Sequence, residues 1–175
     1  MSAPRIDSQS VAARITAARA AINASDIPDL AGRVALIGPP GAIPDDVPYR
    51  AELRELLRVV NGMRCDGVGV TGSNDLRYTD YSDLLEGGSE KWLCIGDFEY
   101  VPVFMERSDG TIWHSMDAGS EDFADVPMAQ IAPDIWSFVG WYAMGPGHLE
   151  IFPDEDGIWV QFLKEHNLFD WEDPA

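Results

Sequence analysis

The stretch from Lys91 to Asp117, KWLCIGDFEYVPVFMERSDGTIWHSMD, constrains the fold most, because it predicts three consecutive strands. The continuous apolar run from Trp92 to Ile95 is typical of a strand that is covered on both faces. Two alternating runs, Val101 to Arg107 and Thr111 to Asp117, flank an Asp-Gly pair, which is a strong short-range signal for a β-hairpin. We therefore expect an antiparallel sheet at the centre of the protein.

A two-residue loop at Asp109-Gly110 would set the register of this hairpin, because side chains alternate between the two faces of a sheet. One face then pairs Val103 with Met116, Met105 with His114 and Arg107 with Ile112, and the other pairs Phe104 with Ser115 and Glu106 with Trp113. The first face is the more apolar, so Val103, Met105, Ile112 and Met116 should point into the core. The second face is mixed. Either a helix covers it or it binds a partner.

Helical periodicity predicts helices over residues 8–24, 48–60 and 133–143, and a last helix that includes Trp159, Phe162 and Leu163. Short strands are expected at residues 33–37 and 148–152. The combination predicts an α+β fold with a central, mostly antiparallel sheet flanked by helices. Residues 1–42 read as an N-terminal helix and short strand appended to a domain that spans residues 43–175, including a C-terminal helical extension.

The charge is strongly acidic and unevenly distributed. The chain has 30 acidic and 12 basic residues, a formal net charge of −18, and residues 1–60 sum to zero. The whole imbalance therefore lies in residues 61–175. Such a field repels nucleic acid and anionic membranes and favours cationic partners. A surface that serves only solubility is the alternative reading.

The sequence carries no pattern for catalysis or for metal binding. No serine stands in a GxSxG elbow, and His114, His148 and His166 are scattered without an HExxH pair. Gly67-x-Gly69-x-x-Gly72 matches the dinucleotide fingerprint formally, but a helix precedes it where that motif needs a strand, so a glycine-rich strand or turn is the better interpretation. We expect a non-enzymatic protein without metal or cofactor.

The remaining signals concern location. Cys65 and Cys94 do not form a CxxC pair, and the pattern leaves open whether they are free or bonded. The N-terminus lacks the apolar core of a signal peptide, and no apolar run approaches the roughly 18 residues of a membrane span. These features predict a cytoplasmic protein that does not bind membranes.

Four segments in this order resemble the SMI1/KNR4 family, also called the SUKH superfamily. They are a proline-led helix ending in Asn-Gly (IPDDVPYRAELRELLRVVNG), the strand WLCIG, the hairpin FMERSDGTIWH and the helix IAPDIWSFVGWY. The similarity covers residues 43–143. After WLCIG the chain departs from the family pattern, because it has DFEYVP where a glycine-containing turn is common.

The resemblance implies an SMI1/KNR4-like α+β fold and a function in binding proteins. Bacterial members are largely immunity proteins that neutralise a partner toxin, often a nuclease, and fungal relatives are regulators. A nuclease toxin presents basic residues to phosphate, so an acidic inhibitor can occupy that surface. The hypothetical binding residues are Asp97, Glu99, Tyr100, Glu121 and Asp122, with Phe104 or Trp113 as an aromatic anchor. A regulatory or scaffold protein, and a small-molecule-binding domain, are the alternatives.

Overall fold

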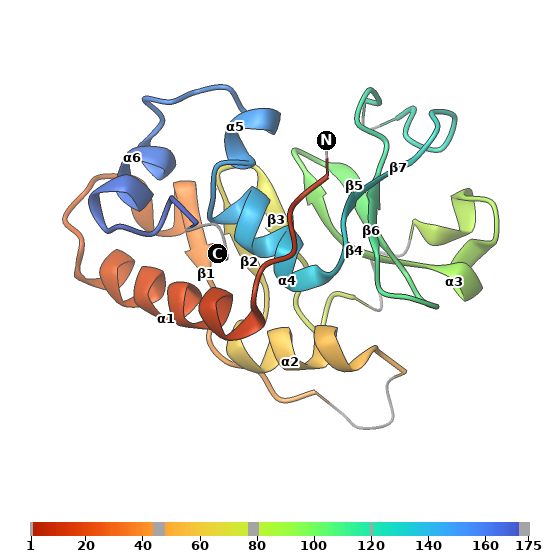
Figure 1. Ribbon diagram of the computed structural model, residues 1–175, viewed down its shortest axis with the longest axis horizontal. Helices are drawn as coiled ribbons and strands as arrows, with labels where there is room; N and C mark the ends of the chain where they lie inside the picture. The colour runs from red at the N-terminus through yellow and green to blue at the C-terminus, as the bar shows by residue number, and fades with distance from the viewer. Residues whose placement is uncertain (1, 44–47, 77–80, 120, 172–175) are drawn as a thin grey trace.

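The computed structural model describes residues 2–43, 48–76, 81–119 and 121–171. One seven-stranded antiparallel sheet, whose strands follow one another in chain order, runs through the molecule (Figure 1). Its strands are β1 (Ala35–Ile37), β2 (Met63–Cys65), β3 (Val68–Val70), β4 (Trp92–Phe98), β5 (Val101–Glu106), β6 (Ile112–His114) and β7 (Ala129–Ala132). The α-helices are α1 (Ser8–Ala24), α2 (Ala51–Val59), α3 (Gly88–Lys91), α4 (Ile135–Phe138), α5 (His148–Ile151) and α6 (Ile158–Glu165), and the shorter helical turns are η1 (Leu30–Val34), η2 (Ser82–Leu84) and η3 (Val139–Ala143). The predicted α+β fold is confirmed.

Helices cover one face of the sheet and share a single core with it. Helix α1 buries Val11, Ile15, Ala18 and Ile22, which recur at helical spacing. These side chains belong to the same apolar cluster as the buried leucines of α2 and the inward residues of β4 to β6. Figure 1 shows α1 and α4 in front of the sheet, with α2 below them. The N-terminal helix is thus an integral part of the core that the rest of the chain builds.

The observed register of the β5–β6 hairpin differs by two residues from the predicted one. Val103 pairs with His114, Phe104 with Trp113 and Met105 with Ile112. The loop is longer than Asp109-Gly110, because the Glu106 N–H donates to the Thr111 carbonyl at 2.9 Å, so that residues 107–110 lie outside the ladder. A shift of two keeps every side chain on its predicted face.

Side-chain hydrogen bonds explain this longer loop. The Asp109 carboxylate accepts from the N–H of Thr111 at 2.9 Å and from its hydroxyl at 2.7 Å. The Arg50 guanidinium, at the start of α2, donates to the carbonyls of Arg107 and Ser108 at 3.3 and 2.8 Å. Those two carbonyls therefore accept hydrogen bonds from the Arg50 side chain and not from the backbone of a neighbouring strand.

The predicted core face is correct for Val103, Met105 and Ile112, each of which is at most 1% exposed. It is wrong for Met116, which is 41% exposed because β6 ends at His114. The predicted strand at residues 148–152 is also wrong. This segment forms α5, because successive N–H groups of His148, Leu149 and Glu150 find carbonyls three residues earlier.

The β6–β7 segment and the residues around η2 cover the second face of the sheet. Trp92, Cys94 and Phe104 form a small apolar cluster with Phe123, which comes from the segment between β6 and β7. Leu85 and Met128 pack at its edge. The glycine-rich segment, for which a strand or a turn was predicted, forms the β2–β3 turn at Gly67 and strand β3 around Gly69. None of the helices that the structure describes is both long and apolar enough to cross a membrane.

Candidate functional site

The turn between β4 and β5 is the most unusual feature on the surface. Phe98 pairs with Val101, so Glu99 and Tyr100 form a two-residue loop. Both have positive φ, +44° and +79°. In two-residue hairpin loops of this conformation the usual residues are Asn-Gly or Asp-Gly. A non-glycine residue held there costs about 1–3 kcal/mol. The Tyr100 side chain lies outside the core, since the residue is 79% exposed.

The neighbouring β2–β3 turn shows what this geometry ordinarily requires. It consists of Asp66 and Gly67, with φ of +44° and +91°, which is the favoured residue pair for the same turn. The two turns are adjacent, because the Glu99 N–H donates to the Gly67 carbonyl at 2.9 Å. The same sheet thus contains one such turn with the favoured residue pair and one, Glu99-Tyr100, without it.

Asp97 holds the strained turn in place. Its Oδ1 accepts from the Tyr100 N–H at 3.1 Å, and its two oxygens form a bidentate pair with Arg64 at 3.1 and 2.8 Å. The ion pair crosses β3 above Gly69, where an added Cβ would lie 2.7 Å from Asp97 Oδ2 and 3.0 Å from Arg64 Nη2. Asp97 is therefore a positioning residue for the turn, and Gly69 makes room for it.

Substituting Gly69→Ala is expected to destabilise the protein by about 2 kcal/mol, because the added methyl group displaces a bidentate ion pair. Urea unfolding monitored by tryptophan fluorescence measures the loss. Gly119→Ala is the matched control, since nothing lies within 4 Å of its added Cβ. Equal midpoints for the two variants would contradict this role for Gly69.

A shallow hollow of about 160 Å³ lies beside the turn. Its lining residues are Thr71, Tyr81, Cys94, Gly96, Asp97, Tyr100 and Pro102. Tyr81 is 47% exposed, and its ring meets the Phe123 ring edge-on at a centroid distance of 5.8 Å. Two tyrosines from separate segments therefore flank one depression next to Asp97. Sequence reasoning did not single out Tyr81, because it comes from a polar segment that precedes β4.

The two proposed aromatic anchors, Phe104 and Trp113, differ in whether a partner can reach them. Phe104 is 1% exposed and lies beneath Phe123, at a ring distance of 6.0 Å, so it cannot contact a partner. Trp113 is half-buried against Trp92 at 5.8 Å, and its Nε1 donates to Thr111 Oγ1 at 2.8 Å. The structure therefore corrects the assignment of Phe104, which packs the second face of the sheet.

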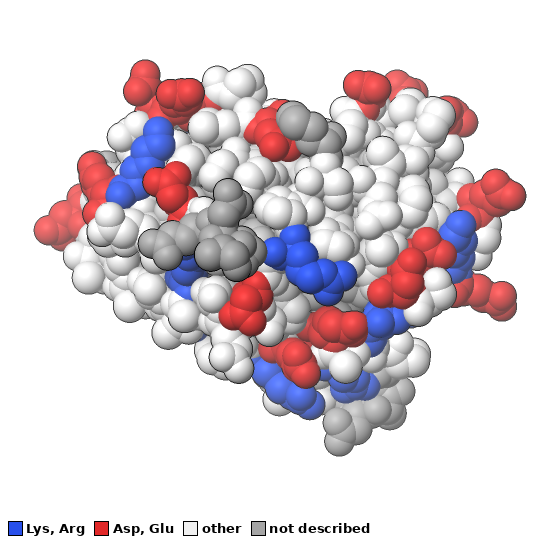
Figure 2. Space-filling view, in the orientation of Figure 1, with Lys and Arg blue, Asp and Glu red and all other residues white. Residues whose placement is uncertain are grey.

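The β6–β7 segment places its predicted acidic residues on the surface. Glu121 and Asp122 are exposed, whereas the next residue, Phe123, is buried on the sheet. The Ser115 hydroxyl donates to the Phe123 carbonyl at 2.8 Å and fixes this segment. In Figure 2 acidic side chains gather at the upper right, where Figure 1 shows the β6–β7 segment, and basic side chains gather near α2.

The described ranges of the chain hold no metal-binding cluster. Three or more ligating side chains do not come together anywhere in those ranges. Cys65 and Cys94 are free and buried, and burial raises the pKa of the Cys65 thiol far above its usual range. A buried, protonated thiol is a poor nucleophile.

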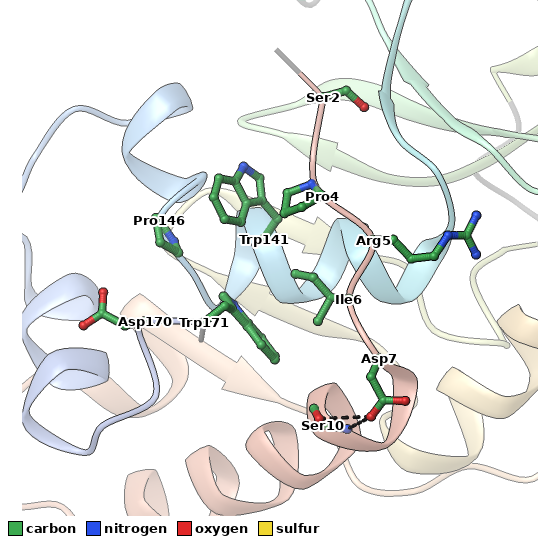
Figure 3. A pocket seen from close by; sticks show the side chains of 10 residues that line it. All are labelled: Ser2, Pro4, Arg5, Ile6, Asp7, Ser10, Trp141, Pro146, Asp170 and Trp171. Atoms are coloured by element: carbon green, nitrogen blue, oxygen red, sulfur yellow. Dashed lines mark hydrogen bonds between the residues drawn. The ribbon is translucent and has the colours of Figure 1, made fainter. Parts of the chain in front are cut away.

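A larger cavity of about 620 Å³ lies on the helical side of the molecule, and none of the predicted site residues lines it (Figure 3). Its described walls come from three segments that are distant in sequence. They are residues 2–10, which include the N-terminal arm (residues 2–7), η3 with the residues that follow it, and residues 170 and 171. A pattern search along the sequence misses such a site, because no two of these segments are close in the chain.

Comparison with known proteins gives no relative. No family model, no curated protein and no solved structure matches the chain.

Proposed function

We propose that this chain is a non-enzymatic binding protein of the SMI1/KNR4 type, an immunity protein that acts in the cytoplasm by binding a toxin with a basic surface. The observation that most strongly supports this proposal is the strained β4–β5 turn. A chain that needed only a connection between two strands would use Asp-Gly there, as the adjacent turn does. Strain of this kind persists at sites that contact a ligand. It also falls where the sequence departs from the resembled family.

Charge and exposure support the same surface. Tyr100 and Tyr81 are large, exposed and amphipathic, which is typical of residues that carry binding energy in protein interfaces. Glu99 lies in the turn, and Glu121 and Asp122 follow on the β6–β7 segment, which packs on the same face of the sheet. We call these five residues the tyrosine–acid surface. Exposed carboxylates around aromatic anchors would attract a basic partner and speed its association.

The test uses the protein encoded beside this chain's gene as the partner. A triple variant, Glu99→Lys, Glu121→Lys and Asp122→Lys, is expected to lower the association rate constant about tenfold at low salt, because it reverses the field at the docking surface. Surface plasmon resonance at low and at physiological ionic strength measures the rate and its salt dependence.

The control changes the net charge by the same amount elsewhere. Glu155, Asp156 and Glu165 are exposed acidic residues in and before α6, outside the tyrosine–acid surface. Their triple replacement by lysine is expected to lower the rate much less. If the two triple variants slow association equally, only the net charge matters and the assigned surface is wrong. If the partner does not bind the native protein, the immunity function is wrong for that partner.

A further inference from the structure

The 620 Å³ cavity has the size and walls of a small-molecule site. Pockets for drug-sized ligands occupy about 300–1,000 Å³ and are mostly apolar and aromatic. Here Trp141 and Trp171 provide two indole walls, and Pro4, Ile6 and Pro146 complete the apolar lining. Figure 3 shows both indoles on the same side of the N-terminal arm as Pro146.

The walls are fixed by the fold, so the cavity is preformed. Trp141 lies directly against Gly147, where any side chain would overlap the indole. The Trp171 Nε1 donates to the Gly140 carbonyl at 2.9 Å, and an added Cβ at Gly145 would lie 2.5 Å from that nitrogen. The glycines after α4 therefore seat the two indoles, in addition to ending the helix.

The N-terminal arm forms the opposite wall and is held at two points. The Ala3 N–H donates to the Ile131 carbonyl at 2.7 Å, and the Ile6 N–H donates to Ser137 Oγ at 3.0 Å. Asp7 then accepts from Ser10 N at 2.8 Å and caps α1. A rigid wall lowers the entropy cost of ordering a site around a ligand.

The charges around the cavity favour a cation. Of the lining residues that the structure describes, Asp7 and Asp170 are acidic and Arg5 is basic. Figure 3 shows the Arg5 side chain directed away from the indoles, and its guanidinium lies 3.5 Å from Asp134 instead. The Arg14 guanidinium lies 3.7 Å from the centre of the Trp171 ring, so one face of that indole already holds a cation, and a ligand cation would use the ring of Trp141. The indole faces are thus suited to cation–π contact.

We propose that this cavity binds an organic cation with an apolar body, such as an aryl- or alkylammonium compound. The apolar body fills the space between the two indoles, and the ammonium group contacts the face of Trp141 and is attracted by the charges of the Asp7 and Asp170 carboxylates. This site is separate from the tyrosine–acid surface and does not depend on the immunity function.

Three probes of one ring and different charge test the proposal, namely benzylamine, benzyl alcohol and benzoate, titrated into the full chain at pH 7. Benzylamine is expected to bind about tenfold more tightly than benzyl alcohol, and benzoate more weakly than either. Indole N–H signals in two-dimensional NMR report the place of binding, and those of Trp141 and Trp171 should move while that of the fully buried Trp159 should not. Equal affinities for the amine and the alcohol, or shifts confined to other indoles, would overturn the proposal.

Two surface variants test the location without disturbing the core. Pro4→Arg places a competing cation at the exposed mouth and should abolish the preference for benzylamine, whereas Pro40→Arg, also at an exposed proline but outside the lining, should not. Asp170→Asn should weaken benzylamine about threefold and leave benzyl alcohol unchanged. If Pro4→Arg and Pro40→Arg affect benzylamine equally, the cavity is not the binding site.

Discussion

Replacement of Glu99-Tyr100 by Asn-Gly is expected to stabilise the folded protein by about 1 kcal/mol and to weaken binding of the basic partner at least about 30-fold. The stabilisation follows because both residues have positive φ, and Asn-Gly adopts that geometry without the steric cost. Glycine makes the unfolded chain more flexible, and the additional entropy lost on folding offsets part of this gain in stability. The loss of binding follows because the most exposed large side chain of the turn is removed.

A single substitution separates the two effects. Tyr100→Ala removes the ring but keeps Glu99 and a side chain with a Cβ at positive φ, so it should cause most of the loss of binding seen with Asn-Gly without the gain in stability. Urea unfolding measures the free energy of unfolding, and equilibrium titration with the partner measures the affinity. An Asn-Gly variant that is both more stable and fully able to bind would show that the strain has no role in recognition.

The sheet could be predicted from sequence, but its register could not. Alternation assigned Val103, Met105 and Ile112 to the core correctly, because the faces of a strand depend only on parity. The length of the β5–β6 loop depends on Arg50, whose guanidinium binds the Arg107 and Ser108 carbonyls across 57 and 58 positions of sequence. The Asp-Gly pair by itself does not predict that long-range contact.

The candidate binding sites could likewise be predicted only in part from the sequence. An acidic and aromatic turn between two predicted strands was visible in the sequence, so Glu99 and Tyr100 could be selected. The burial of Phe104 was not visible, because Phe123, which covers it, comes from a loop whose packing has no periodicity. The indole-lined cavity needs residues 4 and 6 beside residues 141 and 171, a proximity that only the tertiary fold establishes.

Acid is expected to destabilise this protein through His114, by about 3 kcal/mol between pH 7 and pH 4. His114 is 4% exposed, its ring lies 4.8 Å from that of Phe98, and burial lowers its pKa from the ordinary 6.5 to about 4. The unfolded chain therefore takes up a proton as the pH falls through 6.5, while the folded chain does not until about 4. Stability is complete above 6.5 and is lost over that interval, at 1.36 kcal/mol per pKa unit.

The variant His114→Leu removes this term and keeps the buried position apolar. Its free energy of unfolding should fall about 3 kcal/mol less than that of the native protein between pH 7 and pH 4, as measured by urea unfolding at both values. His148 is buried too, and its pKa is also lowered by burial, so the variant should retain part of the acid sensitivity. His166→Leu, at an exposed histidine, is the control and should leave the native pH dependence intact. Identical pH profiles for the native protein and the His114→Leu variant would mean that His114 takes up its proton as readily in the folded state as in the unfolded one, and that its burial does not control acid stability.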